Sequence, residues 1–122
     1  MNQILNEITV NNITYVPKGT NTNSVEVDGL KAVIVGAGIG GIHFGFLKER
    51  KGCEVTLLNA RRIQYWDGAA SITEMAARGV SKPQNCRFST SVYEIVLPNV
   101  VEVLTISPQA LKNLQEVPVW TK

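Results

Sequence analysis

The sequence is poor in the side chains on which most enzyme active sites depend. Among its 122 residues it has one histidine, His43, and two aspartates, Asp28 and Asp67. A site with several histidine ligands is therefore excluded, and carboxylate sites for hard cations have few residues to draw on. A Ser-His-Asp triad would need His43, yet no Gly-x-Ser-x-Gly motif accompanies it. We expect a binding protein, not an enzyme, with neither a metal nor a cofactor.

Features of exported and membrane proteins are also missing. The longest uncharged apolar run, Ala32 to Ile42, is much shorter than the roughly 20 residues that cross a bilayer. The first ten residues lack the charged start and long apolar stretch of a secretory signal. Cys53 and Cys86 are too few for a disulfide framework and are not spaced for zinc, so we expect reduced, half-buried thiols. These absences favour a protein of the cell interior.

The composition that remains is that of a folded domain. Hydrophobic residues make up 44% and charged residues 18% of the chain, enough for one domain with its own core. The net charge of +2 is too small to predict DNA binding, but residues 48–87 carry +4 and the remainder −2. We expect any anion site in this central segment. The alternative is a solvated basic face, which is common.

Residue patterns predict an α+β fold with a small, twisted, mainly antiparallel sheet and two short helices. Beta-branched runs on either side of Asn11 and Asn12 predict a β-hairpin within residues 1–18. A polar linker is expected over 19–29 and the main ligand-binding domain over 30–122. Further strands are expected at 32–35, 53–58, 61–66, 92–97 and 100–106. Helices are expected at 72–78, between a Ser71/Glu74 capping box and Gly79, and from Pro108 to about 116 after Ser107.

A glycine-rich segment after the first of these strands has two interpretations. GAGIGG at 36–41 has the Gly-x-Gly-x-x-Gly spacing of a dinucleotide-binding turn followed by a helix. However, Asn59 stands where such folds place an acidic residue for the ribose, and IHFGF at 42–46 alternates like a strand. We favour a glycine-kinked hairpin that turns at Lys51 and Gly52. A flavin- or nicotinamide-binding fragment is the alternative.

The best candidate binding cluster lies within NARRIQYWDGA, residues 59–69. Two arginines suited to phosphate stand beside two aromatic residues on which a base can stack, namely Arg61, Arg62, Tyr65 and Trp66. Asn85 is a candidate for an additional base-edge contact. Together these residues predict a nucleotide pocket. A structural interpretation of the same residues has equal weight. In it the aromatic residues belong to the core, the arginines cap a sheet edge, and Asn85 belongs to a polar loop.

Four stretches give the chain a family resemblance: GIHFGFL at 41–47, EVTLLNARRIQYWDGAASITEMA at 54–76, SKPQNC at 81–86, and VYEIVLPNVVEVLTIS from 92, leading to VPVW, which ends at 120. On these motifs the chain resembles a family of small tailed-phage proteins of unknown function. That family in turn is similar to the phage anti-CBASS sponges. Such sponges are small oligomers that trap cyclic nucleotide signals of host defence.

The resemblance implies sequestration of a cyclic di- or oligonucleotide without cleavage, in the cytoplasm of the infected bacterial host. It also implies a homo-oligomer. From the exposed strands we expect a dimer or tetramer, and from the apolar runs and the net charge we expect that it binds neither membrane nor DNA. Around the ligand it places Arg61, Arg62 and Trp66, with His43 and Gly41 where the backbone comes close. The rival function is an accessory protein that binds a host protein through Tyr65, Trp66 and the VPVW tail.

Overall fold

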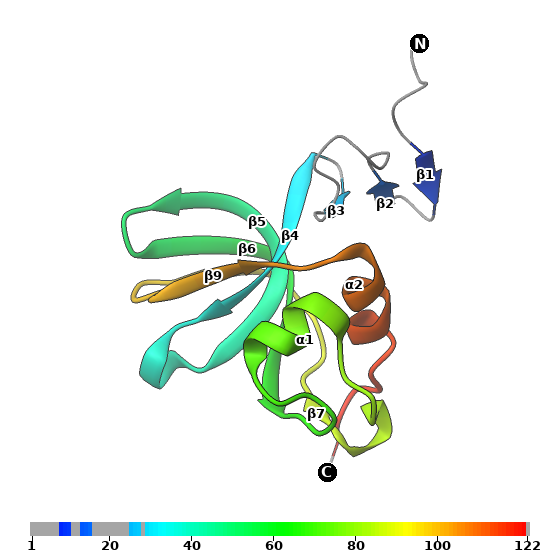
Figure 1. The fold of residues 1–122 in the computed structure, drawn as a ribbon. Helices are drawn as coiled ribbons and strands as arrows, with labels where there is room; N and C mark the ends of the chain where they lie inside the picture. Colours follow the sequence, from blue (N-terminus) through cyan, green and yellow to red (C-terminus); the bar gives the residue numbers. More distant parts are fainter. Residues whose placement is uncertain (1–7, 11–12, 16–24, 28, 122) are drawn as a thin grey trace.

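A computed structural model describes residues 8–10, 13–15, 25–27 and 29–121. Within them the chain has the predicted α+β architecture (Figure 1). The strands are β1 (Ile8–Val10), β2 (Ile13–Tyr15), β3 (Val25–Val27), β4 (Leu30–Gly36), β5 (Ile42–Lys51), β6 (Glu54–Tyr65), β7 (Arg87–Phe88), β8 (Val92–Leu97) and β9 (Glu102–Thr105). The helices are α1 (Ile72–Arg78) and α2 (Pro108–Gln115), with 3₁₀ turns η1 (Gly38–Gly40) and η2 (Pro83–Asn85).

The centre of the sheet consists of β4, β5 and β6, which pair antiparallel in chain order. The outer edge of β4 is shared: β3 pairs with its first residues and β9 with its last ones. The outer edge of β6 is shared in the same way, by β8 along residues 55–60 and by β7 near its end. The short outer strands thus extend a three-stranded centre on both sides.

The sheet curls strongly, as the long β5 and β6 arrows show in Figure 1. The connection between β8 and β9 ties two distant parts of it together. The Val100 N–H donates to the carbonyl of Cys53 at the β5–β6 turn, at 2.9 Å, and the Val101 N–H donates to the carbonyl of Gly36 at the end of β4, at 2.8 Å. The tip of the β5–β6 hairpin is thereby held near the end of β4.

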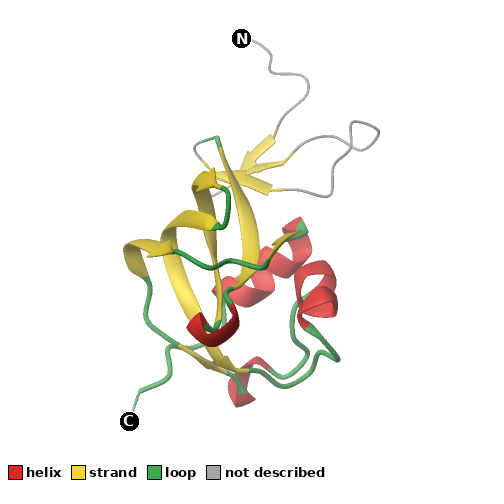
Figure 2. Ribbon diagram, turned by 90° about the vertical axis from the view of Figure 1, so that its left-hand side faces the viewer, coloured by secondary structure: helices red, strands yellow, loops and turns green. Residues whose placement is uncertain are grey.

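Alternation along the strands produces a core on each face of the sheet. On β4, Ala32 and Ile34 face one way, and Val33 and Val35 face the other. The first core lies between the sheet and the two helices, which cover one side of the sheet in Figure 2. The second core lies inside the curl, and its buried members are Val33, Val35, Ala37, Val55, Leu57, Ala60, Leu97 and Val100.

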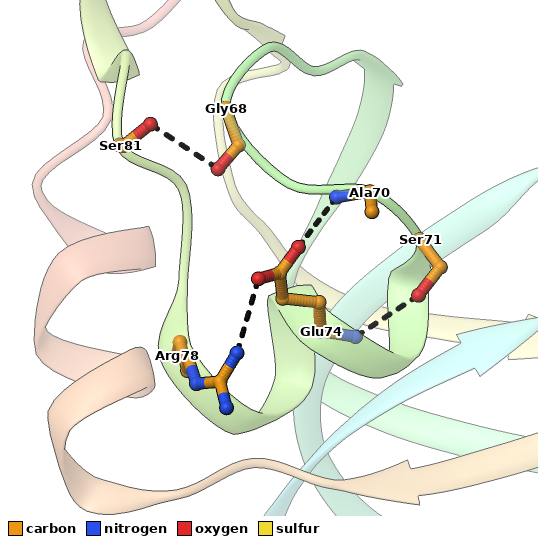
Figure 3. A network of polar contacts seen from close by, with 6 residues as sticks. All are labelled: Gly68, Ala70, Ser71, Glu74, Arg78 and Ser81. Carbon is orange, nitrogen blue, oxygen red and sulfur yellow. Dashed lines mark hydrogen bonds and ion pairs between the residues drawn. The ribbon is translucent and has the colours of Figure 1, made fainter.

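Both helices begin and end as their sequences predict, apart from a one-residue difference at the end of α2. In α1 the Ser71 hydroxyl accepts from the Glu74 N–H at 3.2 Å, and the Glu74 carboxylate reaches back to the Ala70 N–H (Figure 3). This amide contact holds the pKa of the Glu74 carboxyl below its ordinary value. Gly79 ends the helix with a φ of 82°. Ser107 caps α2 by accepting from the Ala110 N–H at 3.0 Å.

The glycine-rich segment forms the predicted hairpin. Residues 42–51 are strand β5 where a dinucleotide-binding fold would have a helix, so the helical interpretation is wrong. The turn lies one residue later than expected, at Gly52 and Cys53. The prediction of separate strands at 53–58 and 61–66 is also wrong, because a bulge at Asn59 lets a single strand, β6, continue through both. Neither thiol is half-buried: Cys53 is exposed and Cys86 is buried.

At the N-terminus, β1 and β2 pair antiparallel as the predicted hairpin requires, with Val10 opposite Ile13. The turn between them and the chain from 16 to 24 lie outside the described residues. Within the predicted linker, 25–27 form strand β3, which pairs with both β2 and β4. Its two valines are β-branched residues, which favour a strand.

Candidate functional site

A bulge in β6 sets the positions of the two neighbouring arginines. Arg61 lies opposite Phe44 on β5, whereas Leu58 lies opposite Phe46, so two residues of β6 face Gly45 alone. Asn59, in the bulge, has a φ of 51°. A side chain at Gly45 would meet the Leu58 carbonyl oxygen at 2.9 Å, which explains the glycine. Because one extra residue reverses the alternation of a strand, the bulge decides which face each arginine occupies.

Arg61 faces the helices and is 8% exposed. Its Nε donates to the Ser89 carbonyl at 2.7 Å and its Nη1 donates to the Val117 carbonyl at 2.9 Å. The guanidinium also lies 5.3 Å from the centre of the Phe88 ring, and burial lowers its pKa. These contacts hold the C-terminal segment against β7. Arg61 is therefore a structural residue in this fold, and we do not place it in the ligand site.

Arg62 faces the opposite side, where a recess of about 240 Å³ opens. It lies directly across from His43 of β5. Seven residues line the recess, from β5, β6, β8 and the segment before β8: His43, Ala60, Arg62, Ser89, Thr90, Val92 and Ile95. The walls are largely apolar, with an imidazole and a guanidinium as the ionisable groups.

His43 is only 1% exposed, and neither ring nitrogen has a hydrogen-bond partner among the described residues. Burial, with a smaller contribution from the charge of Arg62, lowers the pKa of His43 from 6.5 to about 4. The imidazole is thus neutral at pH 7, with one N–H donor and one nitrogen acceptor. A buried polar group without a hydrogen-bond partner destabilises the folded state, so His43 is an unusual core residue.

The Arg62 guanidinium lies over the β4–β5 turn. Its Nη1 donates to the Gly40 carbonyl at 3.0 Å. Gly41 has a φ of 90°, and a Cβ there would lie 3.3 Å from Arg62 Nη1, so this position favours glycine. The Arg62 N–H donates to the Ser89 hydroxyl at 2.8 Å. Arg62 takes part in none of the three ion pairs found within the described residues.

The fold therefore brings together three of the predicted site residues, Gly41, His43 and Arg62. Tyr65 lies elsewhere, at the end of β6, where the Arg87 guanidinium is 5.8 Å from its ring centre and 5.2 Å from that of Trp120.

Trp66 and Asn85 lie outside the recess as well. The Trp66 indole N–H donates to the Ala69 carbonyl at 3.0 Å, and the ring packs against the first core. The Asn85 side chain donates to the Asp67 carboxylate at 3.1 Å. Both side chains thus have structural partners.

Sequence reasoning missed the wall that Ser89, Thr90, Val92 and Ile95 supply. The polar run STS at 89–91 indicates a break between two strands, but its position beside β6 depends on the pairing of Val92 with Ala60. Such a long-range contact has no local signal. The hydrophobic alternation in VYEIVL predicts a strand, but it does not predict the strand with which it pairs.

In the described part of the chain, no group of three or more histidine, cysteine, aspartate or glutamate side chains is placed to hold a metal ion. None of the helices in that part is long and apolar enough to span a membrane.

These features define a small α+β protein with a curled antiparallel sheet and an arginine-rimmed recess on the face away from its helices. The chain belongs to the family described as "Domain of unknown function (DUF6948)", which matches residues 30–114. The match runs from the first residue of β4 into α2, so it includes every residue of the recess. No curated protein and no solved structure matches the chain.

Proposed function

We propose that this protein binds and sequesters a cyclic di- or oligonucleotide, and that it does so in the cytoplasm of a phage-infected bacterium. The observation that carries the proposal is the recess beside Arg62, which combines apolar walls, a buried neutral imidazole and an arginine that makes no ion pair with any described residue. A nucleotide has the matching parts: a flat base, a sugar with polar hydroxyls, and a phosphate.

Arg62 is the phosphate-binding group in this proposal. A guanidinium has five N–H donors in one plane, and among the residues that the structure describes only the Gly40 carbonyl accepts from one of them. Two parallel hydrogen bonds to phosphate oxygens suit this geometry. The positive charge of residues 48–87 adds long-range attraction for an anion.

His43 and the apolar wall receive the uncharged part of the nucleotide. The imidazole offers one donor and one acceptor, which matches the edge of a base or a ribose hydroxyl. Ala60, Val92 and Ile95 supply apolar surface against a base or sugar. Binding would give His43 the hydrogen-bond partner that it lacks among the described residues.

Retention without cleavage fits the same lining. None of the seven residues has a carboxylate or a thiol, and the low pKa of His43 makes it a weak base at pH 7. A protein that sequesters its ligand needs only a complementary site and slow dissociation.

The proposal is tested by calorimetric titration with a panel of cyclic di- and trinucleotides. We expect tight binding of at least one of them, and chromatography of the ligand released by denaturation should recover it intact. Arg50→Ala, which removes an exposed arginine on β5, is the matched control for Arg62→Ala. Failure of every cyclic nucleotide to bind, or recovery of a cleaved product, overturns the proposal.

A second candidate function is supported by the surface around Arg87. Tyr65, Val119 and Trp120 are 52%, 50% and 40% exposed, and Arg87 stacks on both aromatic rings. Aromatic and arginine side chains are frequent anchors of protein interfaces. Under this rival proposal, the protein binds a host protein there. Tyr65→Ala and Trp120→Ala would then abolish capture of that protein while cyclic nucleotide binding stays absent in the wild type.

A further inference from the structure

We infer that two copies of this chain pair along the outer edge of β8, antiparallel about a two-fold axis, and that this dimer joins two recesses into one ligand site. The pairing rests on β8 itself. The joined site rests in addition on the proposed function, because it concerns the size and symmetry of the ligand.

The outer edge of β8 has the properties of a strand that is built to pair. Its inner edge pairs with β6 over residues 55–60, and no other described strand pairs with it. Free edges in monomeric proteins are usually protected by lysine, proline or a bulge. The sequence of β8, VYEIVL, contains none of these residues, and its pairing with β6 is regular.

The side chains of β8 are unusually apolar for their exposure. Val92, Tyr93 and Val96 are 46%, 73% and 49% exposed. The single charged residue, Glu94, is paired with Lys48 of β5 at 3.4 Å. Alternation places Val92 and Val96 on one face of the strand and Tyr93 on the other, so exposed apolar side chains lie on both sides of its outer edge. Exposed apolar side chains gathered at one edge are a feature of interaction surfaces.

A second copy fits this edge because an antiparallel pair of identical strands is complementary to itself about a two-fold axis. With Ile95 on the axis, Tyr93 of each copy lies across from Leu97 of the other, and Glu94 lies across from Val96. No like charges then face each other directly, and an aromatic residue faces an aliphatic one.

The recess extends as far as β8, the strand that would pair, since Val92 and Ile95 belong to its lining. Its volume of about 240 Å³ is below the roughly 300 to 1,000 Å³ of ordinary small-molecule sites, so one recess is suited to one nucleotide. A cyclic dinucleotide contains two nucleotides related by approximate two-fold symmetry. Pairing at β8 sets the second recess across an axis of the same kind.

The pairing is tested by light scattering coupled to size exclusion, over a range of protein concentrations. We expect wild type to have at least the mass of two chains, and Tyr93→Lys and Val96→Lys to shift to the mass of one. Val101→Lys is the matched control, because Val101 is 75% exposed but lies in the β8–β9 connection. Wild type with the mass of one chain, or both β8 variants with the wild-type mass, overturns the pairing.

The joined site is tested by titrating a cyclic dinucleotide that binds the wild type. We expect one ligand to bind for every two chains. In Tyr93→Lys and Val96→Lys the affinity should be at least tenfold weaker, while their circular dichroism spectra should match that of the wild type. Binding of one ligand per chain with the same affinity in both variants overturns the joined site while the proposed function stands. A wild-type dimer that binds no cyclic nucleotide overturns both the joined site and the proposed function while the pairing stands.

Discussion

Arg61 and Arg62 are adjacent on β6, yet their guanidinium groups serve opposite faces of the sheet. Arg61 Nη1 donates to the Val117 carbonyl beyond α2 at 2.9 Å, whereas Arg62 Nη1 donates to the Gly40 carbonyl at 3.0 Å. Neighbouring residues of a strand point to opposite sides, so only one of the two could line the recess. This makes the pair a built-in comparison between a structural and a candidate binding arginine.

Arg61→Ala is expected to lower the free energy of unfolding by about 3 kcal/mol, because buried carbonyls lose a charged donor. Lysine should recover little of this loss, since it cannot bond at once to carbonyls on both sides. Chemical denaturation measures the effect. Arg62→Ala is the control, and it should lower the free energy of unfolding by less than about 1 kcal/mol. Equal stability of Arg61→Ala and wild type would contradict the structural role.

Arg62→Ala is expected to weaken binding of a cyclic nucleotide by about one to two powers of ten. The reason is the loss of a charge-assisted contact worth roughly 1.5 to 3 kcal/mol. Arg62→Lys should retain part of the affinity, because it keeps the charge and loses the planar fork. Calorimetric titration measures both variants. Wild-type affinity in Arg62→Ala would place the pocket elsewhere on the protein.

Acid should destabilise the protein through His43 before most carboxylates titrate. The pKa is about 4 in the folded protein against an ordinary 6.5, so as pH falls the unfolded chain takes up the proton first. The contribution of His43 to the free energy of unfolding is therefore complete above pH 6.5, and it is lost as the pH falls from 6.5 to 4. Between pH 7 and pH 5 the loss should be about 2 kcal/mol.

Denaturation curves at pH 7, 6 and 5 measure this loss. His43→Gln is the comparison, because glutamine keeps polar atoms in the recess and does not titrate. The decline in stability over this interval should largely disappear in that variant. An undiminished decline in His43→Gln would assign the pH dependence to other groups.

The bulge in β6 is tested at Asn59, whose φ of 51° is a left-handed conformation that favours glycine and tolerates asparagine. Asn59→Gly should keep the stability within about 1 kcal/mol of wild type, whereas Asn59→Val should lower it by about 1 to 2 kcal/mol. Thermal and chemical unfolding measure both variants. Tolerance of valine at this position would mean that the bulge does not need the left-handed backbone.

Local signals in the sequence were sufficient for several elements of the fold. The ends of the two helices were predictable because caps act within a single turn of chain. Helix α1 begins after the Ser71/Glu74 capping box and ends at Gly79, and α2 begins at Ser107 and Pro108. The alternation of Ile42, Phe44 and Phe46 predicted a strand and outweighed the Gly-x-Gly-x-x-Gly spacing before it.

For the candidate site, the sequence by itself determined which residue types were available: one histidine, a pair of arginines and a glycine at position 41. Only the tertiary structure decided that Gly41, His43 and Arg62 meet, and that Arg61 turns away to bind the C-terminal segment. The physical reason is the bulge at Asn59. One additional residue reverses the faces of a strand, and its presence depends on how β6 pairs with β5, which no local pattern in the chain records.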